Sequence, residues 1–127
     1  MTWDEALAFA LTLPGAKLST SYGQPTATVN GHGFLGTGRE RDTSFGLRLD
    51  HETVALMMEV DPGTFWKTPH YAGYPAVLVR YDTPHDDLVR DMIARAHAQA
   101  AAKKPSKPVP KRTSSVLGIW LSVTVSM

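Results

Sequence analysis

Three short segments between residues 26 and 50 constrain the fold most strongly, because close turn signals join them. The residues around Asn30-Gly31 form a hairpin pattern, since this pair supplies the positive φ that a tight turn needs. Strands are predicted on either side of it, at residues 26–30 and 34–37. Residues 43–50 then alternate, with Phe45, Leu47 and Leu49 on one face, which is typical of a half-buried antiparallel strand. The chain is therefore expected to fold around an antiparallel meander, preceded by a short extended piece at residues 17–22.

Three segments with helical spacing of apolar residues flank this meander. Residues 3–13 follow a Thr2–Glu5 capping-box pattern, and residues 51–60 follow Asp50 as a cap. A third helix is predicted from Pro84, capped by Thr83, with a buried stripe that runs to Ala100. The mixture of strands and helices predicts the α+β class.

An aromatic stretch at residues 65–81 lies between the second and third helices. Residues 65–68 and 76–81 are predicted strands, and the second is expected to end the sheet. The loop between them, Pro69–Pro75, is too rich in proline and glycine for a predicted helix and too aromatic for an ordinary solvent loop. This loop is the starting point for any functional hypothesis.

Length and composition exclude several classes of protein. A chain of 127 residues is expected to form one domain. The absence of cysteine excludes disulfides, thiolate nucleophiles and cysteine-bound zinc. The acidic start lacks the basic and apolar regions of a signal peptide, and no apolar run reaches the length of a membrane span. We therefore expect a cytoplasmic protein that is not bound to a membrane.

The charges are distributed unevenly along the chain. Residues 1–102 carry eight lysines and arginines against twelve acids, whereas residues 103–112 carry five cations and no acid. These shifts predict a folded domain at residues 1–102, a basic Pro/Lys linker at 103–112 and an apolar tail at 113–127. The sequence leaves open whether this tail is a terminal strand, an oligomer contact or a segment without a role.

Several short motifs together resemble the MmcQ/YjbR family over about residues 3–102. They are Leu13-Pro14-Gly15, Ser21-Tyr22-Gly23-Gln24-Pro25, Asp61-Pro62, Thr68-Pro69-His70-Tyr71 and Tyr74-Pro75. The resemblance implies a CyaY-like α+β fold, in which a twisted antiparallel sheet carries its helices on one face. It also implies DNA binding, for which a "double wing" site is proposed in this family. The family usually has a Trp at the start of the strand after the loop histidine, whereas this chain has Tyr74-Pro75-Ala76 there.

The aromatic loop and its flanks offer both parts of a nucleic-acid site, which are cations for phosphate and aromatic faces for bases. Lys67 and Arg80 are predicted to contact phosphate, with Arg48 on a neighbouring strand. Tyr71 and Tyr74 are predicted to stack on bases, and His70 to donate a hydrogen bond or position the loop. The basic linker would add a contribution that does not depend on sequence. Alternatively, the two tyrosines cover the end of the sheet and His70 bonds to a backbone carbonyl.

A catalytic function is not predicted, because the chain has no GxSxG, P-loop, GxGxxG or HExxH motif. His85 and Asp87 have the spacing of a metal pair, but aspartate is expected at a helix start in any case. We therefore predict no cofactor and no metal. The alternative to nucleic-acid binding is a protein-interaction module that uses the acidic helices or the apolar tail.

Overall fold

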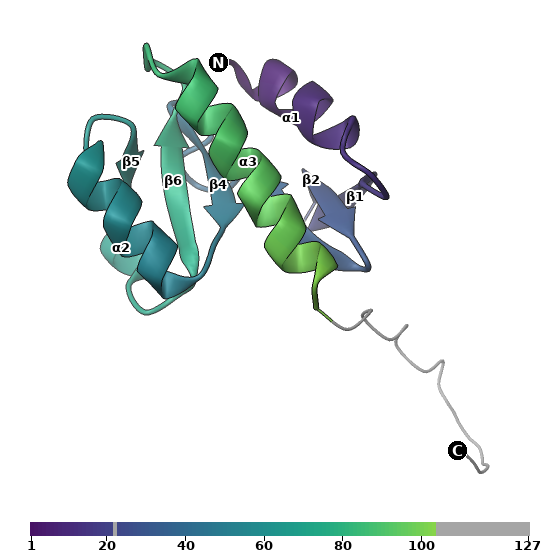
Figure 1. The fold of residues 1–127 in the computed structure, drawn as a ribbon. Coiled ribbons are helices and arrows are strands. Elements are labelled where there is room, and N and C mark those ends of the chain that lie inside the picture. Colours follow the sequence, from purple (N-terminus) through teal and green to yellow (C-terminus); the bar gives the residue numbers. More distant parts are fainter. Residues whose placement is uncertain (22, 104–127) are drawn as a thin grey trace, which may run out of the picture.

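The computed structural model describes residues 1–21 and 23–103, which form a six-stranded antiparallel sheet and three α-helices (Figure 1). The predicted linker beyond residue 103 and the apolar tail lie outside the described residues, as does Tyr22. The strands are β1 (Lys17–Ser21), β2 (Gln24–Val29), β3 (His32–Gly36), β4 (Ser44–Arg48), β5 (Phe65–Trp66) and β6 (Ala76–Arg80).

The sheet has the strand order β1-β2-β3-β4-β6-β5, so that its first four strands form the predicted meander. The short extended piece at residues 17–21 is its first strand, and Ser21 pairs with Gln24 across the first turn. Asn30 and Gly31 both have positive φ in the turn between β2 and β3, as the hairpin pattern predicted. The prediction that the strand at residues 76–81 ends the sheet is wrong, because β6 pairs with β4 on one side and with β5 on the other.

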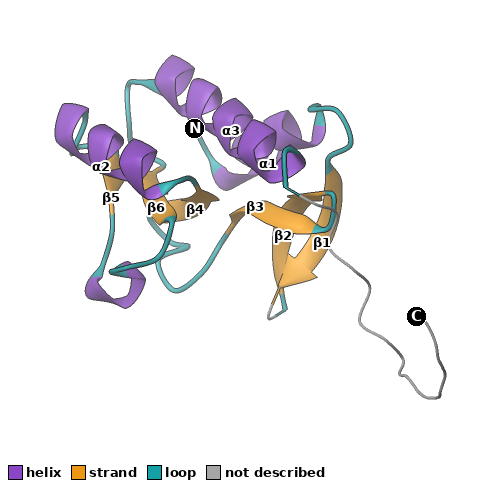
Figure 2. Ribbon diagram, turned by 60° about the horizontal axis from the view of Figure 1, so that its bottom comes forward, coloured by secondary structure: helices purple, strands orange, loops and turns teal. Residues whose placement is uncertain are grey.

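The three helices, α1 (Trp3–Leu11), α2 (His51–Val60) and α3 (Asp86–Ala101), lie on one side of the sheet (Figure 2). Helix α3 packs against β2, β3 and β4 and against α1, while α2 packs against β5 and β6. This arrangement confirms the predicted α+β class with its helices on one face. The other face of the sheet carries no α-helix and is here called the helix-free face (Figure 2).

The hydrophobic core lies between the helices and the sheet. It is built around three fully buried phenylalanines, Phe34, Phe45 and Phe65. The predicted apolar stripe of α3 is buried with the exception of Leu88, which is only partly buried. On α2, Met57 is buried and Met58 packs against the core, as expected for methionines that fill gaps in a core.

Two of the three predicted helix caps are confirmed. Thr2 accepts a hydrogen bond from the Glu5 amide, and the Glu5 carboxylate accepts one from the Thr2 amide. Asp50 accepts a hydrogen bond from the Thr53 amide at the start of α2. The prediction for the third helix is wrong, because α3 begins at Asp86 and its N-cap is His85. The Thr83 hydroxyl instead lies 2.6 Å from the Thr64 hydroxyl and accepts a hydrogen bond from the His85 amide.

The cap of α2 predicts a measurable dependence of stability on pH. The pKa of Asp50 is lowered from 3.8 to about 2, chiefly because the hydroxyl of Thr53 and then the amide of Gln99 donate hydrogen bonds to its carboxylate. A lowered pKa stabilises the folded protein above pH 3.8, and this contribution is lost as the pH falls towards 2.

We therefore expect Asp50→Asn, which retains a capping oxygen, to unfold at lower urea concentration than the wild type at neutral pH. The difference should shrink as the pH is lowered from about 5 to about 2.5. Urea unfolding curves across this range measure it. A difference that stays constant with pH would contradict the assigned role of the carboxylate.

Candidate nucleic-acid interface

The helix-free face of the sheet can be assigned from the alternation of side chains along β4, β5 and β6. Val77 and Val79 belong to the core on the helix side, so Ala76, Leu78 and Arg80 point to the opposite face. The strand register then places the following neighbours on that same face: Ser44, Gly46 and Arg48 on β4, and Trp66 on β5. Two of the six predicted site residues, Arg48 and Arg80, therefore lie on the helix-free face.

The acids and the strands are separated in this fold. None of the six strands contains an aspartate or a glutamate, whereas the three helices carry seven of them. The strands carry Lys17, Arg48 and Arg80. The net negative charge of the folded part therefore belongs largely to the helix side, and the helix-free face is its less acidic side. The sequence total alone conceals this difference.

The predicted loop between β5 and β6 contains one turn of 3-10 helix, η1 (Pro69–Tyr71), so the expectation that it holds no helix is wrong. A single such turn tolerates proline at its first position, because the missing N–H has no partner there in any case. The carbonyl of Thr68 accepts a hydrogen bond from the Tyr71 amide, and Gly73 then adopts a φ of +85°. Figure 2 shows η1 on the side of the sheet opposite α2.

The ammonium group of Lys67 connects the two ends of this loop. Its Nζ donates a hydrogen bond to the carbonyl of Tyr74 at 3.1 Å. An ammonium group has three N–H donors, so one bond to a carbonyl leaves donors for a phosphate. Lys67 thus fixes the loop and keeps its positive charge available beside it.

The two tyrosines of the loop are not equivalent. Tyr74 is 59% exposed, whereas Tyr71 is half-buried. A Cβ atom added at Gly38 would lie 2.9 Å from the Tyr71 hydroxyl, so the ring reaches across to the loop between β3 and β4. His70 is exposed and meets Tyr71 edge-on, with ring centroids 5.1 Å apart. Tyr71 is therefore partly covered and lies against the loop between β3 and β4, while Tyr74 and His70 face solvent.

Three of the predicted residues, Arg48, Lys67 and Tyr74, are connected at the end of β6 where the chain enters the strand, and His70 lies in the loop that precedes it. This end of β6 is at the bottom of Figure 1. Arg48 is exposed and pairs with Ala76, and the Leu49 amide donates to the Pro75 carbonyl at 3.1 Å. Tyr74 precedes this point directly, and Lys67 is bonded to it. We call these residues the basic-aromatic patch: Arg48, Lys67, His70 and Tyr74.

Arg80 lies at the other end of β6, about 13 Å from Ala76 along the strand. Its guanidinium group sits over the ring of Trp66, 4.5 Å from the ring centroid. The Trp66 indole N–H donates to the hydroxyl of the buried Ser44 at 3.0 Å, which fixes the ring. Sequence reasoning missed the part that Trp66 plays here. The strand predicted at residues 65–68 contained a signal for it, because period-two alternation places Trp66 opposite Phe65.

The surroundings of the three cations differ. Among the described residues, no carboxylate lies within 4.0 Å of a side-chain nitrogen of Arg48, Lys67 or Arg80. The end of the sheet near Arg80 nevertheless has acidic neighbours. Burial, and secondarily the charge of Asp42, raises the pKa of Tyr81, whose hydroxyl donates to the Arg41 carbonyl at 2.8 Å. Asp42 therefore lies near the end of β6 that carries Arg80, whereas no carboxylate of the described residues pairs with Arg48 or Lys67.

His85 and Asp87, which have the spacing of a metal pair in the sequence, each form a different contact in the structure. His85 Nδ1 lies 2.8 Å from Asp61 Oδ2, and Asp87 pairs with Arg90. Within residues 1–21 and 23–103, no group of three or more histidines and acids is arranged to hold a metal ion. None of the helices in this part of the chain combines the length and the apolar character that a membrane crossing requires.

Comparison with known proteins adds relatives but no function. No protein-family model matches the chain. It is 37% identical over 60 residues to uncharacterised proteins of Mycobacterium bovis and Mycobacterium tuberculosis. The match covers 46% of this chain and 46% of each relative, so the chain aligns with about half the length of these proteins. Their names state no ligand and no activity.

Proposed function

We propose that this protein binds single-stranded nucleic acid on the helix-free face of its sheet, without catalysing a reaction. The main support for the proposal is the unequal distribution of charge between the two faces of the sheet. Arg48, Lys67 and Arg80 lie beside acid-free strands and outside any ion pair of the described residues, while the helix side holds seven acids. An exposed aromatic ring, Tyr74, lies within the same patch.

Each residue has a distinct role in this proposal. Arg48 and Lys67 contact the phosphates of the strand that crosses the basic-aromatic patch, and Tyr74 stacks on one of its bases. His70 donates a hydrogen bond to the bound strand. Arg80, held over the ring of Trp66, contacts a more distant phosphate with its N–H groups. Tyr71, which is half-buried with its hydroxyl near Gly38, does not stack on a base in this proposal.

Single strands are favoured over duplexes because the faces of unpaired bases are accessible to an aromatic ring. The DNA binding implied by the resemblance to the MmcQ/YjbR family agrees with this proposal. The basic residues at 103–112 would add salt-sensitive affinity for any nucleic acid. The alternative of a protein-interaction module is favoured by a different surface, the exposed apolar side chains of α2.

A salt titration tests the proposed function. Fluorescence anisotropy of a labelled single-stranded oligonucleotide should give a plot of log affinity against log salt that falls with a slope of about −2 or steeper, because three phosphate contacts each contribute about −0.7. Neutralising the five cations at 103–112 with glutamine should leave a slope of about −2. No saturable binding at about 50 mM salt would contradict the proposal.

Replacing Tyr74 separates stacking from charge. Tyr74→Ser should weaken single-strand binding by about 5-fold or more, because stacking on an aromatic ring is worth roughly 1–3 kcal/mol per base. The salt slope should not change, since no charge is removed. The control is Leu18→Ser, which alters an equally exposed apolar side chain on β1, far along the sheet. Equal effects of the two substitutions would contradict a stacking role for Tyr74.

A further inference from the structure

A hollow of about 410 Å³ lies on the helix side of the molecule, where the end of α2 approaches the start of α3. Its lining consists of the apolar side chains of Val60 and Leu88 together with Asp61, His85 and Asp87. The hollow is on the face of the sheet opposite the basic-aromatic patch, so the proposed function does not use it.

Exposed apolar side chains extend this hollow along α2. Leu56 is 52% exposed and Val60 is 58% exposed. The two residues are four positions apart, so they lie on one face of the helix and form a continuous apolar strip. Large exposed apolar side chains on a helix are costly in water unless another group covers them.

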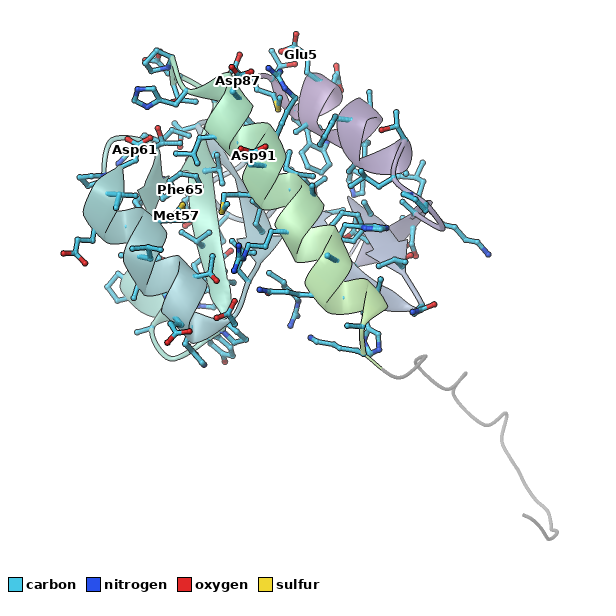
Figure 3. All side chains as sticks on the ribbon, viewed as in Figure 1. Glu5, Met57, Asp61, Phe65, Asp87 and Asp91 are labelled. Carbon is cyan, nitrogen blue, oxygen red and sulfur yellow. The ribbon has the colours of Figure 1, made fainter. Side chains whose placement is uncertain are left out.

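The rim of the hollow contains the carboxylates of Asp61 and Asp87, which pair with His85 and Arg90, and the two helices beside it are acidic overall. Helices α2 and α3, with the cap residue Asp61, carry six carboxylates against two arginines, Arg90 and Arg95. Figure 3 shows Asp87 and Asp91 on α3 and Asp61 near the end of α2. A ligand for this surface is therefore expected to combine an apolar segment with a basic one.

We propose that residues 116–125 of the same chain dock on the strip formed by Leu56, Val60 and Leu88, while the cations at 103–112 lie against the acidic helices α2 and α3. This segment has the required chemistry, because it contains seven large apolar residues and no charge: Val116, Leu117, Ile119, Trp120, Leu121, Val123 and Val125. The five cations at 103–112 precede it with no acid among them, so a basic part directly adjoins the apolar part.

The length of the connecting chain permits this contact. Helix α3 has sixteen residues and is about 24 Å long, and the hollow lies at its start. Residues 104–115 are twelve residues, which can span up to about 40 Å. The chain that leaves the end of α3 can therefore return to the hollow within the same molecule.

Fluorine NMR of the full chain labelled with 5-fluorotryptophan tests this docking. The chain has three tryptophans, Trp3, Trp66 and Trp120, and Trp120→Phe assigns the third resonance. In the wild type the Trp120 resonance should be broadened and protected from a soluble paramagnetic quencher. The double variant Leu56→Ser/Val60→Ser should shift it towards the position of a solvent-exposed tryptophan and increase its quenching at least 3-fold.

The same spectra contain the controls. Both replaced residues are more than half exposed, so the variant should fold, and unchanged resonances of Trp3 and Trp66 report this. Leu18→Ser, at a side chain that is 59% exposed on β1, should not move Trp120. A Trp120 resonance that ignores the α2 substitutions overturns the proposal. A position that depends on protein concentration also overturns it, because the segment would then dock on a second copy.

Discussion

Replacing Arg48, Lys67 and Arg80 together by alanine is expected to reduce the affinity for a single-stranded oligonucleotide by at least 10-fold and to reduce the salt slope by about 2. The slope changes because three phosphate contacts no longer release counterions. The same anisotropy titration as for the wild type measures both quantities. The change in slope does not depend on how many contacts the cations at 103–112 make.

A matched control removes cations from the helix side of the fold, where Arg90 and Arg95 lie on α3. The double variant Arg48→Ala/Lys67→Ala is measured beside the triple variant, and Arg90→Ala/Arg95→Ala has the same net charge as this double variant. The Arg90→Ala/Arg95→Ala variant should retain most of the affinity and nearly all of the slope. Equal losses in the two double variants would show that net charge, and not this face, governs binding.

Replacing Phe45 by alanine is expected to lower the free energy of unfolding by about 3 to 5 kcal/mol. Phe45 is fully buried on β4, in the middle of the sheet, where it pairs with Val79. Its ring centroid lies 6.2 Å from that of Trp3 and 6.0 Å from that of Tyr81, so one side chain joins α1, β4 and the end of β6. A cavity at this point cannot collapse without moving all three.

Urea unfolding of the wild type and of Phe45→Ala measures this loss. Leu18→Ala, at a side chain that is 59% exposed on β1, is the control and should change the free energy by no more than about 0.5 kcal/mol. A loss below about 1 kcal/mol for Phe45→Ala would contradict the position assigned to it at the centre of the core.

Local patterns in the sequence predicted those elements whose signals lie within a few residues. The Asn30-Gly31 turn, the alternation around Phe45 and the caps at Thr2 and Asp50 are of this kind, and the structure confirms all of them. The prediction that Thr83 caps the third helix is wrong because a distant residue determines the position of its side chain. Its hydroxyl is held by Thr64, nineteen residues earlier, and no local pattern contains that contact.

The candidate site depends more than these local elements do on the pairing of strands that are distant in the sequence. The sequence shows Tyr71 and Tyr74 as similar residues in one loop, but the approach of Tyr71 to Gly38 distinguishes the covering ring from the exposed one. The order of the strands, with β6 between β4 and β5, brings Arg48 beside Ala76 and Arg80 over Trp66. The sequence of the six strands contains no acid. Only the structure shows that the acidic helices all lie on one face of the sheet, which leaves the other face less acidic (Figure 2).

Chemical-shift mapping with a ¹⁵N-labelled full chain and an unlabelled single-stranded oligonucleotide tests the location of the interface most directly. The largest shifts are predicted at residues 48, 67, 70 and 74, with smaller ones at 80 and none on the outer faces of α1 and α3. Shifts that concentrate on the helices, or no shifts at a saturating concentration at low salt, would contradict a nucleic-acid interface on the helix-free face.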